Sequence, residues 1–109
     1  MKTPIILTIS FLIAAPLAVR AADAKTNWAN NCAQCHGASG KGDTKMGKML
    51  NAMDLTDPRK QSSFTDAQAA AAIKDGIKQS GKTTMKAFGG KLSDDEIKAL
   101  VAYVRTLKK

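Results

Sequence analysis

The chain has 109 residues, with 17 Lys and Arg against nine Asp and Glu, which gives a formal net charge of +8. This length allows one small domain, near the size at which a hydrophobic core barely stabilises a fold and a cofactor or cross-link is usually recruited. The two cysteines and single histidine are too few for the four ligands of a structural zinc site.

The N-terminal segment has the organisation of a secretory signal peptide. Lys2 precedes an apolar run, Ile5 to Val19, and Ala21 ends the small-residue pattern that a signal peptidase reads. The run is shorter than the roughly 20 residues of a membrane-spanning helix. We therefore predict a cleaved signal peptide over 1–21, with cleavage after Ala24 as the alternative. The remaining domain over 22–109 is predicted to be basic, exported and periplasmic.

The first helix of the mature chain is predicted over Ala24–Cys35, which contains neither Gly nor Pro. It leads into Cys32-Ala33-Gln34-Cys35-His36, where both cysteines meet the only histidine. Thiols three residues apart share one face of a helical turn and can bond two vinyl groups on one porphyrin edge. His36 then lies under the iron as an axial ligand. This spacing is typical of a c-type haem attachment site.

Three other interpretations of the two cysteines carry less weight. A thioredoxin-like pair follows a strand in a βαβ pattern, and no strand-like run precedes Cys32. A zinc site lacks two ligands. A disulfide between Cys32 and Cys35 would close a very short loop and stabilise little.

The middle of the chain alternates turn and helix signals. Glycines at 37, 40, 42 and 47 end the first helix and let the backbone bend around a bulky flat group, and Asp54–Pro58 has the residues of a turn. Thr65 and Gln68 form a capping-box pair, so a second helix is predicted from Thr65. Its apolar residues at helical spacing are Ala69, Ala70, Ile73 and Ile77.

A third helix is predicted at the C-terminus. Ser93 and Glu96 form a capping box, and an apolar stripe follows at Ile97, Leu100, Val101, Val104 and Leu107. No stretch alternates apolar and polar residues, so we predict three or more helices and no sheet. Trp28, Phe88 and Tyr103 are interpreted as core or helix-contact residues.

The second axial position on the iron has several candidates: Met46, Met49, Met53, Met85, a lysine, or an open site. Met46, Met49 and Met53 follow His36 closely and are interpreted as packing beside the ring. Met85 lies in a predicted loop between Gly81 and Gly89-Gly90, and the glycines let this loop reach the iron.

Three segments, Cys32–Gly37, Met85–Leu92 and the helix start Ser93–Ile97, together resemble the small bacterial class I cytochromes c, which are monohaem electron carriers. The resemblance implies an all-α class I cytochrome c fold of three to five short helices around one haem c, covalently attached through Cys32 and Cys35. It also implies iron ligation by His36 and Met85. Many members of this class have Pro after the ligand Met, whereas this chain has Lys86.

The predicted function is single-electron transfer between redox proteins, not enzymatic catalysis, because two axial ligands leave no position for a substrate. The alternatives are a haem subunit of a larger redox complex and a gas-binding cytochrome with a labile sixth ligand. The partners are expected to present acidic docking surfaces to a ring of lysines. These lysines are Lys41, Lys45, Lys48, Lys82, Lys86 and Lys91. We expect no nucleic-acid partner, no stable membrane insertion after cleavage, and a monomer.

Overall fold

The computed structural model describes residues 2–10 and 21–109. Residues 1 and 11–20 of the predicted signal peptide therefore lie outside the described residues, and 2–10 form neither helix nor strand. Within the described part of the chain, no helix has the length and apolar character that crossing a membrane would require.

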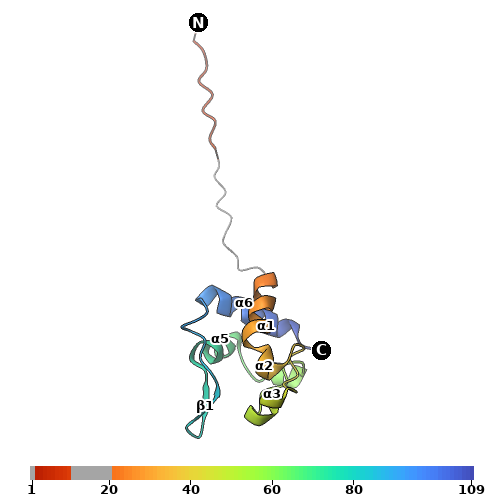
Figure 1. Ribbon diagram of the computed structural model, residues 1–109. Helices are drawn as coiled ribbons and strands as arrows, with labels where there is room; N and C mark the ends of the chain where they lie inside the picture. Colours follow the sequence, from red (N-terminus) through yellow and green to blue (C-terminus); the bar gives the residue numbers. More distant parts are fainter. Residues whose placement is uncertain (1, 11–20) are drawn as a thin grey trace.

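The described domain contains six helices and one two-stranded sheet. Helices α1 and α5 both pack against α6. The hairpin and α3 lie at the end of the domain away from α6, at the bottom of the view in Figure 1. The helical prediction is confirmed. The helices outnumber the expected three to five because two of them, α2 and α4, are only four residues long. The helices are Ala21–Asn31 (α1), Ala33–His36 (α2), Lys45–Leu50 (α3), Pro58–Gln61 (α4), Asp66–Asp75 (α5) and Asp94–Thr106 (α6).

The core lies between α1, α5 and α6. Four residues of the predicted α6 stripe, Ile97, Leu100, Val101 and Val104, are buried there, and Leu107 packs at the edge. The same cluster also contains Trp28, Cys32, Leu55, Ile73, Phe88 and Leu92. Both predicted capping boxes are present, Thr65 with Gln68 at α5 and Ser93 with Glu96 at α6.

The predicted helix Ala24–Cys35 is divided in two. Helix α1 ends at Asn31, and Cys32 has φ −111°, well outside the helical value near −63°. The chain resumes as α2, in which the Cys32 carbonyl accepts hydrogen bonds from both Cys35 N (3.2 Å) and His36 N (2.9 Å). Gly37, with φ 80°, ends α2.

The prediction of no sheet is wrong, because β1 (Ile77–Gln79) and β2 (Lys82–Met85) form an antiparallel hairpin. Ser80 and Gly81 both have positive φ, 51° and 77°, which is the geometry of a two-residue type I′ turn. The strands are too short and exposed to show an alternating pattern. Ile77, predicted on the second helix, belongs to β1, and Met85, predicted in a loop, is the last residue of β2.

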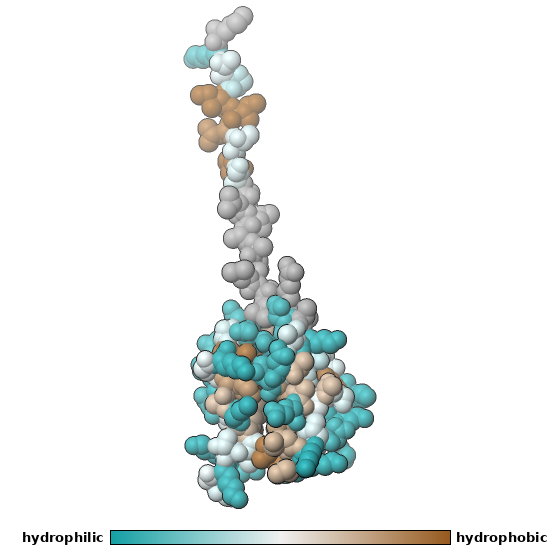
Figure 2. Space-filling view, in the orientation of Figure 1, coloured by the Kyte–Doolittle hydropathy of each residue, from teal (hydrophilic) through white to brown (hydrophobic). Residues whose placement is uncertain are grey.

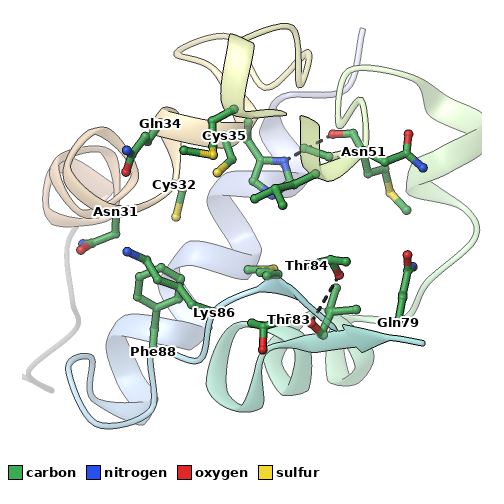
Figure 3. Close-up of a pocket in the computed structure, with 17 residues that line it drawn as sticks. Asn31, Cys32, Gln34, Cys35, Asn51, Gln79, Thr83, Thr84, Lys86 and Phe88 are labelled. Atoms are coloured by element: carbon green, nitrogen blue, oxygen red, sulfur yellow. Dashed lines mark hydrogen bonds between the residues drawn. The ribbon is translucent and has the colours of Figure 1, made fainter. Parts of the chain in front are cut away.

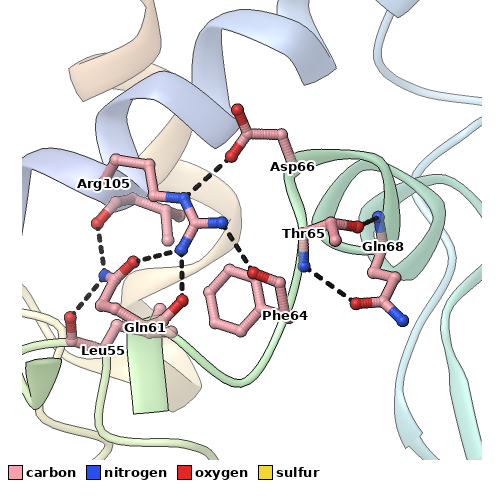
Figure 4. A network of polar contacts seen from close by, with 8 residues as sticks. Leu55, Gln61, Phe64, Thr65, Asp66, Gln68 and Arg105 are labelled. Atoms are coloured by element: carbon pink, nitrogen blue, oxygen red, sulfur yellow. Dashed lines mark hydrogen bonds and ion pairs between the residues drawn. The ribbon is translucent and has the colours of Figure 1, made fainter. Parts of the chain in front are cut away.

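A polar network joins α4 and the start of α5 to α6 (Figure 4). Gln61 is 4% exposed and donates hydrogen bonds to the carbonyls of Leu55 and Val104. Arg105 donates to the backbone and side-chain oxygens of Gln61, to the Phe64 carbonyl and to Asp66. The network fixes the chain that follows α3 against the last turns of α6.

Candidate functional site

The domain has a crevice with two adjacent compartments that share lining residues. The outer compartment has a volume of about 380 Å³ and the inner one about 190 Å³. Cys32 and Cys35 lie on one side of the crevice, and Gln79, Thr83 and Thr84 of the hairpin lie across from them (Figure 3). Both compartments share five lining residues, which are Cys32, His36, Met53, Ile77 and Met85. The predicted attachment segment and the end of β2 therefore face one space.

Helix α3 holds the Cys32–His36 segment in place. The Thr44 hydroxyl donates its one proton between the carbonyl oxygens of Gln34 (2.8 Å) and Cys35 (2.9 Å) and accepts from Gly47 N (2.9 Å). A Cβ on Gly47 would lie 2.1 Å from the Cys35 oxygen, a separation that real side chains do not reach. Glycine at 47 therefore allows α3 to lie directly on α2.

The His36 imidazole is oriented by the backbone that follows α3. Its Nδ1 lies 3.3 Å from the Met53 carbonyl oxygen, so the proton belongs on Nδ1 and the lone pair of Nε2 is free to bind a metal. Burial lowers the pKa of His36 below its ordinary value, and the Met53 hydrogen bond opposes this in part. A neutral imidazole is the form that ligates iron.

No disulfide joins Cys32 to Cys35, and Cys32 is buried. Burial, and secondarily the neighbouring Cys35, raise the pKa of Cys32 to about 11. Dithiol redox proteins instead depend on a thiol with a lowered pKa, so Cys32 does not have the electrostatics of the attacking thiol in a thioredoxin-like site. In the described residues, no three Cys, His, Asp or Glu side chains are grouped as metal ligands.

The predicted axial methionine lies on the hairpin side of the crevice. Met85, the last residue of β2, lines both compartments and packs against the core. Among the other methionines, Met53 lines both compartments and Met46 lines the outer one, whereas Met49 is 72% exposed and lines neither. Cys32, His36 and Met85 thus come together although 49 residues separate His36 from Met85.

Sequence reasoning missed several lining residues. The hairpin contributes Ile77, Gln79 and Thr83, which the adjacent Ser80-Gly81 turn could have indicated. Leu55 and Phe64 line the inner compartment, and no local pattern in the sequence marks them as wall residues.

The donor set and the walls suit a flat, largely apolar group bonded at one edge. The inner compartment is lined almost wholly by apolar side chains, and the outer one combines two thiols, an imidazole and three thioethers. A sequence profile of the cytochrome c family matches residues 21–108. The chain belongs to the cytochrome c family. Members of this family carry covalently attached haem c, and Cys32 and Cys35 of this cytochrome are consistent with the CxxCH attachment motif.

Solved structures agree with this membership. The c-type cytochrome KustC0563 is 31% identical to this cytochrome, with a TM-score of 0.71, over 79% of this chain and 98% of that one. A point mutant of KustC0563 gives 31% identity and a TM-score of 0.69, over 79% and 99%. The comparison with curated proteins gave no match. The fold class, family and cofactor predicted from the sequence are confirmed, and haem-based electron transfer is the function typical of such cytochromes.

Proposed function

We propose that this cytochrome c is a periplasmic monohaem carrier of single electrons, with haem attached at Cys32 and Cys35 and iron ligated by His36 and Met85. The observation that supports this most strongly is that Cys32, His36 and Met85 all line both compartments of the crevice. Cys32, His36 and Met85 could therefore all hold one group in this crevice.

The chemistry of the proposed carrier follows from these residues. Bound haem c would supply a one-electron iron couple. The Met85 thioether, together with the His36 imidazole, would favour the reduced state and raise the reduction potential compared with two imidazoles, and the apolar inner walls would act in the same direction. Two protein ligands would leave no position on the iron for a substrate. We therefore propose a carrier rather than an enzyme.

Partners would approach the open side of the crevice. Apolar side chains at the mouth, Met46 and Ile77, are 39% and 38% exposed, and Lys86 lines the outer compartment. Lys45 and Lys48 lie on α3 and Lys82 on β2, on the two sides of the mouth. Apolar groups also reach the surface of the lower part of the domain between hydrophilic residues (Figure 2). We propose brief docking, by a monomer, to acidic surfaces of redox proteins.

The test is the absorption spectrum of the dithionite-reduced protein before and after CO is added, compared with Met85→Ala. We expect the wild-type spectrum to stay unchanged and the variant to shift, because CO occupies the position that the thioether leaves. Met49→Ala is the matched control, since Met49 lies outside both compartments, and it should behave as the wild type.

Other outcomes would overturn parts of the proposal. A CO-induced shift in the wild type would favour the gas-binding alternative with a labile sixth ligand. Co-purification of a second protein through high salt would favour a subunit of a larger redox complex. A protein without a haem spectrum, after production with the cytochrome c maturation machinery, would contradict attachment at Cys32 and Cys35.

A further inference from the structure

The strand that carries Met85 is tied to the C-terminal end of α5. Phe88 N donates to the Ile73 carbonyl at 2.9 Å, and Gly89 N donates to the Lys74 carbonyl at 3.0 Å. Within the hairpin, Met85 is the register partner of Ile77. The chain on both sides of Met85 is therefore attached to one short piece of backbone, the α5 end with the β1 start.

Gly76 lies at the centre of this junction. Its φ is 75° and its ψ is −178°, a region that is open essentially to glycine alone. A Cβ at this position would lie 2.5 Å from the Met85 oxygen, 2.9 Å from Ala87 N and 3.1 Å from the Lys86 carbonyl carbon. All three contacts are to backbone, which cannot move aside as a flexible side chain can.

We propose that Gly76 is a positioning residue for Met85: without a side chain, it lets the 85–87 backbone pack on the end of α5 and so holds the thioether at the wall of the crevice. This inference rests on the proposed role of Met85 as an axial ligand. The physical need is clear, because an isolated two-stranded hairpin is marginally stable and β1 is exposed along its length. The hairpin alone would not hold a sulfur atom at a fixed distance from a metal.

The hairpin tip offers a matched control. Gly81 has φ 77°, nearly the φ of Gly76, but a Cβ there would have no atom within 4 Å. We would compare haem-loaded Gly76→Ala and Gly81→Ala by the rate of CO binding to the reduced protein and by the reduction potential. For Gly76→Ala we expect CO binding about tenfold faster or more, from strain of the size stored at such positions, and a lower potential. Gly81→Ala should match the wild type in both.

A second pair of variants perturbs the same junction without positive φ. A Cβ on Gly89 would lie 3.0 Å from the Lys74 oxygen, whereas a Cβ on Gly90 would have no atom within 4 Å. Gly89→Ala should accelerate CO binding by a smaller factor than Gly76→Ala. Gly90→Ala should leave the rate of CO binding unchanged. If Gly76→Ala yields no haem-loaded protein, the comparison of Gly89→Ala with Gly90→Ala tests the proposed role of the junction.

General loss of stability is separated from loss of position by Glu96→Ala, which removes the acceptor for Ser93 N and the Asn27 amide at a residue that lines neither compartment. It should lower stability and keep the wild-type CO rate. Equal CO rates and potentials in the Gly76 and Gly81 variants would overturn the role of Gly76 but not that of Met85. If Gly76→Ala gives no haem-loaded protein, equal CO rates in the Gly89 and Gly90 variants would have the same meaning. Wild-type CO binding as fast as that of Met85→Ala would overturn the axial role of Met85 and, with it, this inference.

Discussion

Arg105 shows how one side chain can connect segments that are distant in sequence. It lies on α6, donates to four oxygens of the 61–66 segment, and places its guanidinium 4.4 Å from the centre of the Phe64 ring. Phe64 lines the inner compartment. The planar fork of donors thus holds one wall of the crevice.

Replacing Arg105 by Lys should lower the free energy of unfolding by about 1–3 kcal/mol, because the ammonium group cannot reproduce the fork and leaves the Gln61 and Phe64 oxygens without a donor. Urea unfolding followed by circular dichroism measures this. Arg59→Lys is the control: its side chain is 94% exposed, and the expected change is within about 0.5 kcal/mol. Equal unfolding midpoints for the two variants would contradict the structural role of Arg105.

For single residues, the sequence predicted those whose chemistry lies in one short motif, but not those that act through contacts between distant segments. Cys32, Cys35 and His36 could be found because their chemistry lies in five consecutive residues. The bonds from Gln61 to Val104 and from Arg105 to Phe64 join residues that are 43 and 41 apart. No local pattern encodes such a pairing. The Met53 carbonyl that orients His36 was hidden for a further reason, since a backbone acceptor has no sequence signal.

Among the elements, α5 and α6 were predictable because their signals are local. A capping box needs only four consecutive residues, and both predicted boxes formed. The hairpin was missed because strands of three and four residues are too short for a period-2 pattern. The helical spacing of Ile77 placed the end of α5 too late. The apolar periodicity of the sequence continues past Gly76, but the helix itself ends at Asp75.

The α6 capping box also predicts a dependence of stability on pH. The backbone N–H of Ser93, and then the Asn27 amide, hold the pKa of Glu96 below its ordinary value of 4.5. A carboxyl whose pKa is lowered in the folded state stabilises that state above the unfolded pKa. This contribution should be complete above about pH 4.5 and be lost as the pH falls through the folded value.

The measurement is a series of urea unfolding midpoints between pH 7 and pH 3. Glu96→Gln should unfold with a shallower dependence on pH in the acid range, because the neutral amide cannot lose a proton-linked contribution. An unchanged slope would show that Glu96 is not among the groups responsible for acid destabilisation.

For the whole molecule, the position of charge matters more than its sum. The proposed docking side includes α3, which carries Lys45 and Lys48 and whose Met46 and Leu50 line the outer compartment. Lys25 on α1 and Lys98 on α6 are also exposed, but the residues next to them in the sequence line neither compartment. Electrostatic attraction to a partner acts through the lysines nearest the contact, since exposed charges beyond about 10 Å are screened at moderate salt.

Electron exchange with a gold electrode coated with a carboxylate-terminated monolayer tests this without a known partner. Lys45→Glu/Lys48→Glu should slow the exchange severalfold at low salt and flatten its salt dependence. Lys25→Glu/Lys98→Glu has the same net charge and should slow it much less. Equal effects of the two double variants would mean that the net charge, and not the α3 side of the crevice, governs docking.

The packing of α1 against α6 also bears on when haem can be attached. Cys32 belongs to the same buried cluster as Leu100 and Val104 of α6, so docking of α6 removes the Cys32 thiol from solvent. An enzyme that bonds haem to this thiol needs access to it. We therefore expect attachment at Cys32 to come before α6 docks on α1.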